Sequence, residues 1–116
     1  MMNPSRVDGV TPLHVIELLF ETDARLVDVR EPREFASVSI RGAVCLKRAA
    51  LEAAIEGHFP DRGTRAICYC NDGGASVLAA DALRSMGYRH AGYLIGGLRQ
   101  WIQEGLPVIR RERFDD

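Results

Sequence analysis

The stretch Ala66-Ile67-Cys68-Tyr69-Cys70-Asn71-Asp72-Gly73-Gly74-Ala75-Ser76 decides the fold. Its first five residues form a short apolar run, which is the pattern of a strand buried on both faces of a sheet. The run from Asn71 to Gly74 is typical of a turn, and a helix is predicted from near Ser76. A strand, a turn and a helix in this order predict a βαβ unit and therefore a parallel sheet.

The rest of the chain repeats this alternation. Thr11 and Pro12 predict the start of a first helix, because Thr is a good N-cap and Pro fits the first helical position. The apolar face of this helix is predicted to hold Leu13, Ile16 and Phe20, with Val15, Leu18 and Leu19 beside them. Short apolar runs at 25–29, 43–46 and 91–95 predict further strands. We therefore expect an α/β fold with an open, mostly parallel sheet of four to five strands and helices on both faces.

Length and charge exclude several classes of protein. The 116 residues suffice for one domain and are too few for two. Fifteen basic and 16 acidic residues give a net charge of -1, so no basic excess points to nucleic acid or to an anionic membrane. No apolar run approaches the roughly 20 residues that span a bilayer, and no signal-peptide pattern is present. We expect a cytoplasmic protein with no nucleic-acid and no membrane partner.

Cys70 is the candidate for chemistry. It ends a predicted strand and precedes a loop with two glycines, at the edge of the sheet where α/β proteins bind ligands. Backbone N–H groups of a tight loop and the positive end of the following helix both favour a thiolate, which is the nucleophilic form of cysteine. The alternative is that Cys70 is a small buried hydrophobic residue, which is common for a free cysteine.

The remaining cysteines and the histidines give weaker signals. Cys68 lies two residues before Cys70 on the same strand, about 6.5 Å away, which is poorly suited to a disulfide. Cys45 is alone on its strand and is expected in the core. Three cysteines with one Cys-x-Cys pair do not match a structural zinc site, and none of the three histidines lies in a motif. No metal site is therefore predicted.

Four ordered motifs resemble those of the rhodanese-like domain family. They are Leu26 to Phe35, Ile40 to Ala43, Ile67 to Ser76, and Gly96-Gly97 followed by Trp101 and Gly105-Leu106-Pro107. The resemblance covers almost the whole chain, and it places the domain at residues 10–108, between an N-terminal segment at 1–9 and a charged C-terminal tail at 109–116. Because the family contains enzymes, carriers and inactive modules, the resemblance is more specific for fold than for activity.

The resemblance implies a sulfurtransferase. Cys70 would attack the outer sulfur of a donor such as thiosulfate, become a persulfide, and pass the sulfur to a thiol or to cyanide, with no external cofactor. The loop of Asn71, Asp72, Gly73, Gly74, Ala75 and Ser76 would hold the persulfide through its backbone N–H groups. Asp28 and Arg30 match a motif near the active-site side of the family fold, where they would either support the site or form a structural ion pair or a helix-cap contact.

Two positions depart from the family pattern. Many active members have arginine five residues after the cysteine, where this chain has Ala75, and this loop also contains Asp72. Both differences make the rim of the site less positive and predict weaker attraction for thiosulfate, unless Arg30 or Arg99 compensates. Related phosphatases have a loop one residue longer that closes with arginine, so phosphatase activity is not expected.

Three functional hypotheses follow. The first is a thiosulfate sulfurtransferase-like enzyme that uses a small sulfur donor and a thiol acceptor. The second is a protein-interaction or sulfur-relay module that receives sulfur from a persulfide-donating protein and uses thiosulfate poorly. The third is an inert regulatory domain in which Cys70 is a core residue.

Overall fold

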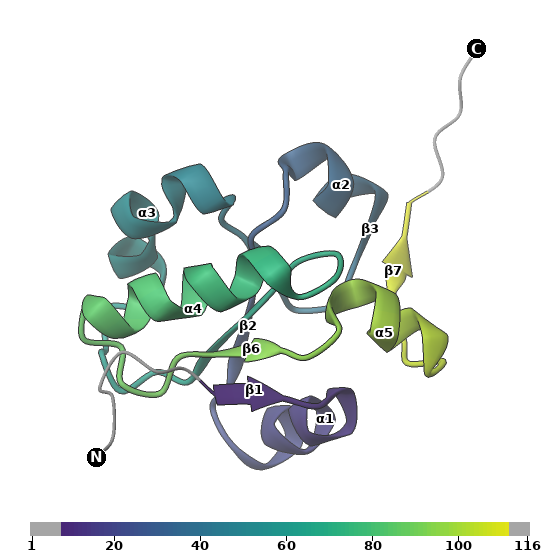
Figure 1. The fold of residues 1–116 in the computed structure, drawn as a ribbon, viewed down its shortest axis with the longest axis horizontal. Helices are drawn as coiled ribbons and strands as arrows, with labels where there is room; N and C mark the ends of the chain where they lie inside the picture. The colour runs from purple at the N-terminus through teal and green to yellow at the C-terminus, as the bar shows by residue number, and fades with distance from the viewer. Residues whose placement is uncertain (1–7, 112–116) are drawn as a thin grey trace.

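A five-stranded parallel sheet forms the centre of the protein in the computed structural model, which describes residues 8–111 (Figure 1). Every neighbouring pair of its strands is parallel. In spatial order the strands are β1 (Asp8–Val10), β6 (Gly92–Leu94), β5 (Ala66–Tyr69), β2 (Arg25–Asp28) and β4 (Val44–Cys45). The deciding strand, β5, thus lies in the middle of the sheet, and the predicted α/β class is confirmed.

Helices cover both faces of this sheet. In Figure 1, α4 (Gly74–Ser85) lies in front of the sheet and α1 (Pro12–Glu21) lies below it. The helix α3 (Leu51–His58) shares a core with α4, and α5 (Gly97–Gln103) shares the opposite core with α1. The remaining elements lie at or beyond the sheet edge: α2 (Pro32–Ser37), β3 (Val38–Ser39), the short 3-10 helix η1 (Arg48–Ala50) and β7 (Ile109–Arg110).

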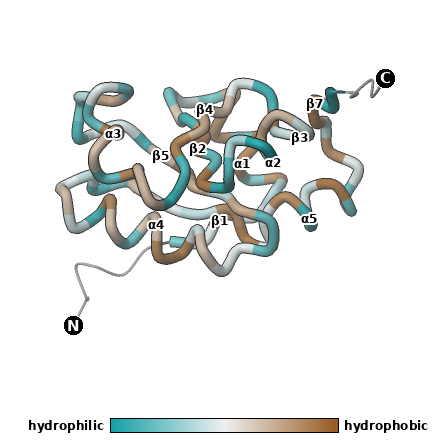
Figure 2. Tube along the Cα trace, turned by 90° about the horizontal axis from the view of Figure 1, so that it is seen from above, coloured by the Kyte–Doolittle hydropathy of each residue, from teal (hydrophilic) through white to brown (hydrophobic). Residues whose placement is uncertain are grey.

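Alternation along the central strands builds both cores. Val27 and Cys68 are paired across β2 and β5 and point to the side of α3 and α4. Leu26 and Ile67 are paired one position earlier and point to the side of α1 and α5. Because all four side chains are almost fully buried, these strands show a continuous apolar run and no polar alternation. Figure 2 shows the hydrophobic stretches in the middle of the molecule, around the labels β2 and β4.

The predicted inner face of α1 is wrong in part. Val15 is fully buried, whereas Leu13 is 63% exposed and Phe20 is 87% exposed. Ile16, Leu18 and Leu19 are partly buried against the core that contains Trp101. Apolar residues surround most of this helix, so the 3.6-residue period allowed more than one inner face, and packing against the sheet selected the one centred on Val15.

Two short strands extend past the range 10–108 predicted for the domain. Asp8 and Gly9 belong to β1, which pairs with β6. Ile109 and Arg110 form β7, which pairs antiparallel with β3. The rest of the predicted N-terminal segment and tail, at 1–7 and 112–116, lies outside the described residues.

The orientation of α1 predicts different effects for two substitutions. Val15→Ala removes two methyl-sized groups from a closed core and is expected to lower the free energy of unfolding by about 1–2 kcal/mol. Phe20→Ala removes a larger side chain that is mostly in water, so its effect should stay within about 0.5 kcal/mol. Urea unfolding of both variants measures the difference. A larger loss for Phe20→Ala would contradict the observed orientation.

Candidate active site

Cys70 lies directly after β5, at the carboxyl edge of the sheet. Cys70 is only 5% exposed to solvent. The chain then turns through Gly73, whose φ of 102° lies in the left-handed region that favours glycine, and α4 begins at Gly74. The helix therefore starts two residues before the Ser76 expected from sequence. This sharp turn brings the first turn of α4 beside the sulfur.

Three groups of the loop surround the sulfur atom. The backbone N–H of Gly73 donates a hydrogen bond to Cys70 Sγ at 3.2 Å. The Ser76 Oγ lies 3.6 Å from the sulfur, and its hydroxyl donates to the carbonyl of Gly73 at 3.1 Å. Asp72 Oδ1 lies 3.9 Å from the sulfur. The Gly73 N–H aimed at the sulfur and the start of the 12-residue helix α4 both stabilise negative charge at this point, whereas the Asp72 carboxylate opposes it.

The other two cysteines are placed differently. Cys68 is completely buried, and this burial raises the pKa of its thiol to about 12, so it stays neutral at physiological pH. Cys45 is half-buried at the end of β4, and burial also raises the pKa of its thiol. It pairs with Asp28, which pairs with Tyr69. Since residues that face each other across strands point to the same side, Cys45 and Cys70 point to opposite faces of the sheet.

The start of α5 holds the loop through backbone hydrogen bonds. The N–H of Leu98 donates to the carbonyl of Cys70 at 2.8 Å, and the N–H of Arg99 donates to that of Asn71 at 3.0 Å. This contact requires glycine at position 97, where a Cβ atom would lie 2.6 Å from the carbonyl oxygen of Cys70. The sequence indicates the paired glycines only as turn and packing residues, because their close approach to the loop depends on the tertiary fold.

A buried ion pair supports the loop from β2. Asp28 is fully buried and Arg30 is 6% exposed. The Arg30 Nη2 lies 2.8 Å from Asp28 Oδ2, and Arg30 Nε bonds both carboxylate oxygens at 3.1 Å. Burial alone would lower the pKa of Arg30, but the hydrogen bonds and charge of Asp28 outweigh it and raise that pKa. These two side chains are thus paired with each other, and among residues 8–111 neither forms a hydrogen bond with the Cys70 sulfur.

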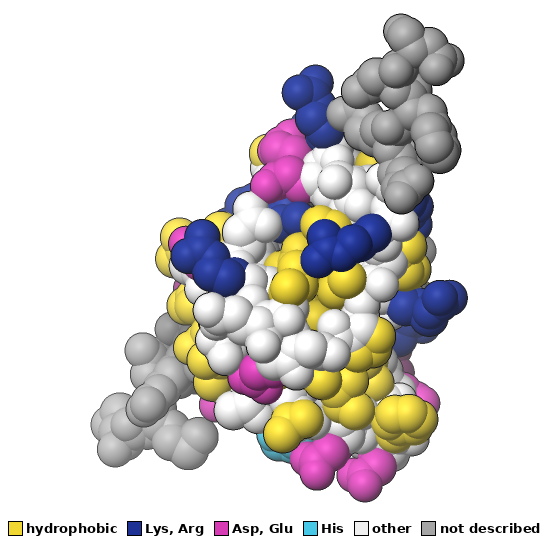
Figure 3. All heavy atoms as spheres, turned by 90° about the vertical axis from the view of Figure 1, so that its right-hand side faces the viewer, with side chains coloured by type: hydrophobic (Ala, Val, Ile, Leu, Met, Phe, Trp, Pro, Cys, Tyr) yellow, Lys and Arg dark blue, Asp and Glu magenta, His cyan; other side chains and the backbone are white. Residues whose placement is uncertain are grey.

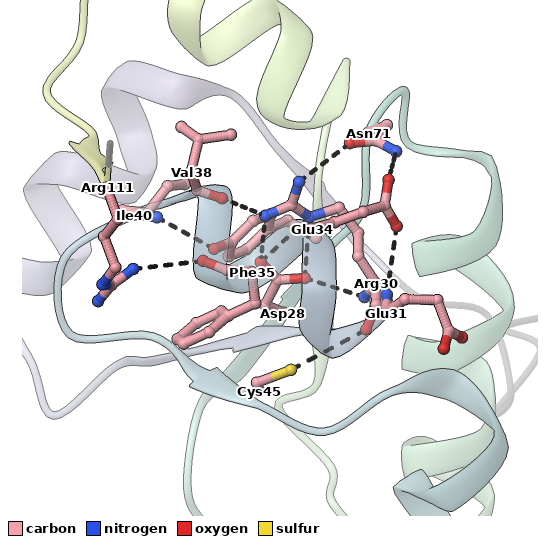
Figure 4. Close-up of polar contacts among 11 residues, drawn as sticks. Asp28, Arg30, Glu31, Glu34, Phe35, Val38, Ile40, Cys45, Asn71 and Arg111 are labelled. Carbon is pink, nitrogen blue, oxygen red and sulfur yellow. Dashed lines mark hydrogen bonds and ion pairs between the residues drawn. The ribbon is translucent and has the colours of Figure 1, made fainter. Parts of the chain in front are cut away.

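Asn71 joins this ion pair to α2 (Figure 4). Its Oδ1 accepts from Arg30 Nη1 at 3.3 Å, and its Nδ2 donates to Glu34 Oε2 at 2.7 Å. The hydrogen bond from Asn71 is the main reason that the pKa of Glu34 is lowered; the backbone of Glu31 and the charge of Arg30 add to it. Glu34 is thus a carboxylate at neutral pH, and its tie to the loop weakens only as the pH falls through this lowered pKa.

The structure brings the predicted loop residues together but gives them different contacts. Gly73, Ser76 and Asp72 surround the sulfur, whereas the Asn71 side chain points to Arg30 and Glu34. Gly74 gives its N–H to Asp72 Oδ1 at 3.0 Å, and Ala75 is exposed on the first turn of α4.

Sequence reasoning missed Glu34 and the contact role of Gly97. The one available signal for Glu34 is its spacing from Glu31, with which it forms a capping box at the start of α2.

Comparison with known proteins identifies the family. A family model described as rhodanese-like domain matches residues 11–104. The thiosulfate sulfurtransferase GlpE of Pseudomonas fluorescens is 36% identical over 90 residues, which are 78% of this chain and 81% of that protein. The chain spans 55% of the length of an uncharacterised Synechocystis protein that is 33% identical over 102 residues. The chain therefore belongs to the rhodanese-like domain family.

Solved structures agree with this assignment. The human single-domain sulfurtransferase TSTD1 is 27% identical with a TM-score of 0.75, covering 84% of this chain and 97% of that one. A thiosulfate sulfurtransferase from Pseudomonas aeruginosa has a TM-score of 0.83 at 22% identity, covering 94% of this chain and 23% of that one, and it shares the fold. The family and these relatives support a rhodanese-like transferase.

Residues 8–111 lack two separate features, a membrane-crossing helix and a metal-holding cluster. None of their helices combines the length and the apolar character needed to cross a membrane. Within the same residues, no three His, Cys, Asp or Glu side chains are grouped so that they could hold a metal ion.

The buried ion pair predicts a large loss of stability when one partner is neutralised. Asp28→Asn keeps the shape of the side chain but leaves the Arg30 guanidinium buried without its counter-charge, which should cost about 3–5 kcal/mol of unfolding free energy. The control is Arg48→Gln, which breaks an exposed pair with Glu52 and should cost less than about 1 kcal/mol. Equal losses in chemical denaturation would refute the structural role of the buried pair.

Because α5 lies so close to the loop, replacing Gly97 by alanine should lower the free energy of unfolding by more than backbone strain alone would. Gly105→Ala tests strain alone, because Gly105 has φ +74° and a Cβ added there would meet no atom within 4 Å; it should cost about 1 kcal/mol. Gly97→Ala adds a clash with the Cys70 and Asn71 backbone and should cost about 1–3 kcal/mol more. Thermal unfolding of the two variants provides the comparison, and equal values would exclude the clash.

Proposed function

We propose that this protein is a sulfurtransferase that takes sulfane sulfur from thiosulfate or a persulfide onto Cys70 and passes it to a thiol or to cyanide. The observation that carries this proposal is the hydrogen bond that the backbone N–H of Gly73 donates to Cys70 Sγ, with 3.2 Å between nitrogen and sulfur. Both groups lie at the carboxyl edge of the sheet. A buried structural cysteine needs no such donor, whereas a sulfur that carries negative charge does. Family membership and the named relatives give independent support.

The first half of the reaction loads Cys70. Its thiolate attacks the outer sulfur of thiosulfate, a new S–S bond forms, and the old S–S bond breaks so that sulfite leaves with the electron pair. With a protonated persulfide as donor, the leaving group is a thiolate, which takes up the proton lost by Cys70. Neither route needs an external oxidant or cofactor, because sulfur moves between two sulfur atoms.

The second half unloads it. A thiolate or cyanide attacks the outer sulfur of the Cys70 persulfide, the S–S bond breaks, and the Cys70 thiolate is restored. The Gly73 N–H and the start of α4 stabilise negative charge on sulfur before and after this step. Arg30 and Asn71 act one layer further out, by holding the loop in the shape that aims the Gly73 N–H.

The sulfur-relay module is the second candidate. The Asp72 carboxylate near the sulfur and Ala75 in place of an arginine favour it, since both weaken the attraction for an anionic small molecule. In this reading a partner protein brings the persulfide to Cys70 directly. A reducing cytoplasm suits either candidate, because all three cysteines are free thiols in the fold.

The test of the proposal is the intact mass of the protein after incubation with thiosulfate without reductant. Wild type should gain the mass of one sulfur atom, and cyanide should remove it as thiocyanate. Cys70→Ser should gain nothing, whereas the control Cys45→Ser, which lacks a thiol on the opposite face of the sheet, should behave as wild type. Matching circular dichroism spectra would show that all three proteins are folded.

Other outcomes separate the hypotheses. No gain from thiosulfate, with full loading by a small alkyl persulfide, would favour the relay module over the thiosulfate enzyme. No loading from either donor, with Cys70 also unreactive toward alkylating reagents, would identify the inert domain. Loading of Cys70→Ser would assign the chemistry to another cysteine.

A further inference from the structure

We propose that Asp72 is a specificity-determining residue, whose carboxylate selects against anionic sulfur donors and favours donors that are uncharged at the reacting sulfur, such as a protonated persulfide. The inference rests on the proposed function of Cys70 and narrows its donor class. Its basis is the position of the carboxylate, which lies 3.9 Å from Cys70 Sγ through Oδ1. Any donor that Cys70 Sγ attacks must therefore come close to the negative charge of the Asp72 carboxylate.

The carboxylate is fixed in this position by the loop itself. The same Oδ1 accepts a hydrogen bond from the N–H of Gly74 at 3.0 Å, which is the first residue of α4. This N–H is one of the free donors at a helix start that would otherwise be offered to an anion. Asp72 therefore has two effects of the same sign: it adds a negative charge beside the sulfur, and it occupies a donor that could bind an oxyanion.

Within residues 8–111, neither of the two arginines that could compensate, Arg30 and Arg99, forms an ion pair with Asp72. The Arg30 guanidinium is almost fully buried and is already neutralised by Asp28, so it does not compensate as the sequence allowed. Ala75 adds no charge on the first turn of α4. The Arg99 side chain is exposed to solvent, and its contact with the loop is made by its backbone N–H.

The discrimination between anionic and uncharged donors should come from Asp72 itself and not from the charge of the whole surface. The face of the molecule that carries α5 shows Lys and Arg as well as Asp and Glu side chains around hydrophobic ones in Figure 3, so its charged side chains are of both signs. The effect should come from one charge a few ångströms from the reacting atoms. A charge at this range near the protein surface changes the rate constant for an anionic reagent by about tenfold.

Two alkylating reagents test the charge effect without requiring sulfur transfer. Cys70 Sγ attacks the CH₂ carbon of both iodoacetamide and iodoacetate, forming a C–S bond while the C–I bond breaks and iodide leaves, but only iodoacetate is an anion. The second-order rate constants at Cys70 are measured by peptide mass mapping for wild type, Asp72→Asn and the control Glu17→Gln. Asn keeps the oxygen that accepts from Gly74 and removes the charge, and Glu17 is an exposed carboxylate on α1.

The expected result is a change in selectivity and not a general change in reactivity. Asp72→Asn should lower the iodoacetamide-to-iodoacetate rate ratio about tenfold at low salt, and Glu17→Gln should leave it unchanged. The difference between wild type and Asp72→Asn should shrink in about 1 M salt, because salt screens it. An unchanged ratio, or an equal change in both rate constants, would overturn the proposal.

Thiosulfate then separates this inference from the proposed function. If both hold, Asp72→Asn should form the Cys70 persulfide from thiosulfate about tenfold faster than wild type at subsaturating concentration. A shifted alkylation ratio with no persulfide from any donor would support the charge effect of Asp72 and refute the sulfurtransferase. Persulfide formation with an unshifted ratio would support the sulfurtransferase and refute the role of Asp72.

Discussion

The site depends on the contacts of the buried Arg30 guanidinium. It binds Asp28 at the end of β2, Asn71 in the loop and the carbonyl of Val38 at the start of β3. It also lies over the Tyr69 ring, with Arg30 Cζ 5.9 Å from the ring centroid. One side chain thus connects β2, the loop after β5 and the ribbon of β3 and β7. Because a buried charge without partners is very costly, these contacts must form together, and the shape of the loop becomes part of the folded state.

A second constraint acts from the other side of the loop. The N-terminal turn of α5 can approach the Cys70 and Asn71 carbonyls only because Gly97 has no side chain. The loop is therefore held at both carbonyls by α5 and at the Asn71 side chain by β2 and α2. A loop fixed in this way presents its Gly73 N–H to the sulfur before any donor arrives, so little reorganisation is needed during transfer.

The sequence allowed the fold to be predicted far better than the detailed contacts. The apolar run of β5 and the turn that follows it have local signals, namely continuous hydrophobicity and turn-forming residues, and both are found where those signals predict them. The inner face of α1 is not, because Leu13 and Phe20 are as apolar as Val15 and only tertiary packing distinguishes them. The contact of Asn71 with Glu34 joins residues 37 positions apart, and no local pattern indicates such a pair.

The residues that hold the loop in place differ from those that set the charge beside the sulfur. Most of the groups that hold the loop are buried or are backbone atoms, namely Asp28, Arg30 and the amides of α5, and the Asn71 side chain adds an exposed link to α2. Changing them alters stability first. Asp72 and Ala75, in contrast, are exposed, and neither is needed by the sheet or by either core. The same scaffold can therefore aim a sulfur in the same way while the charge beside that sulfur changes, and a change at these two positions costs less stability than a change in the buried ion pair.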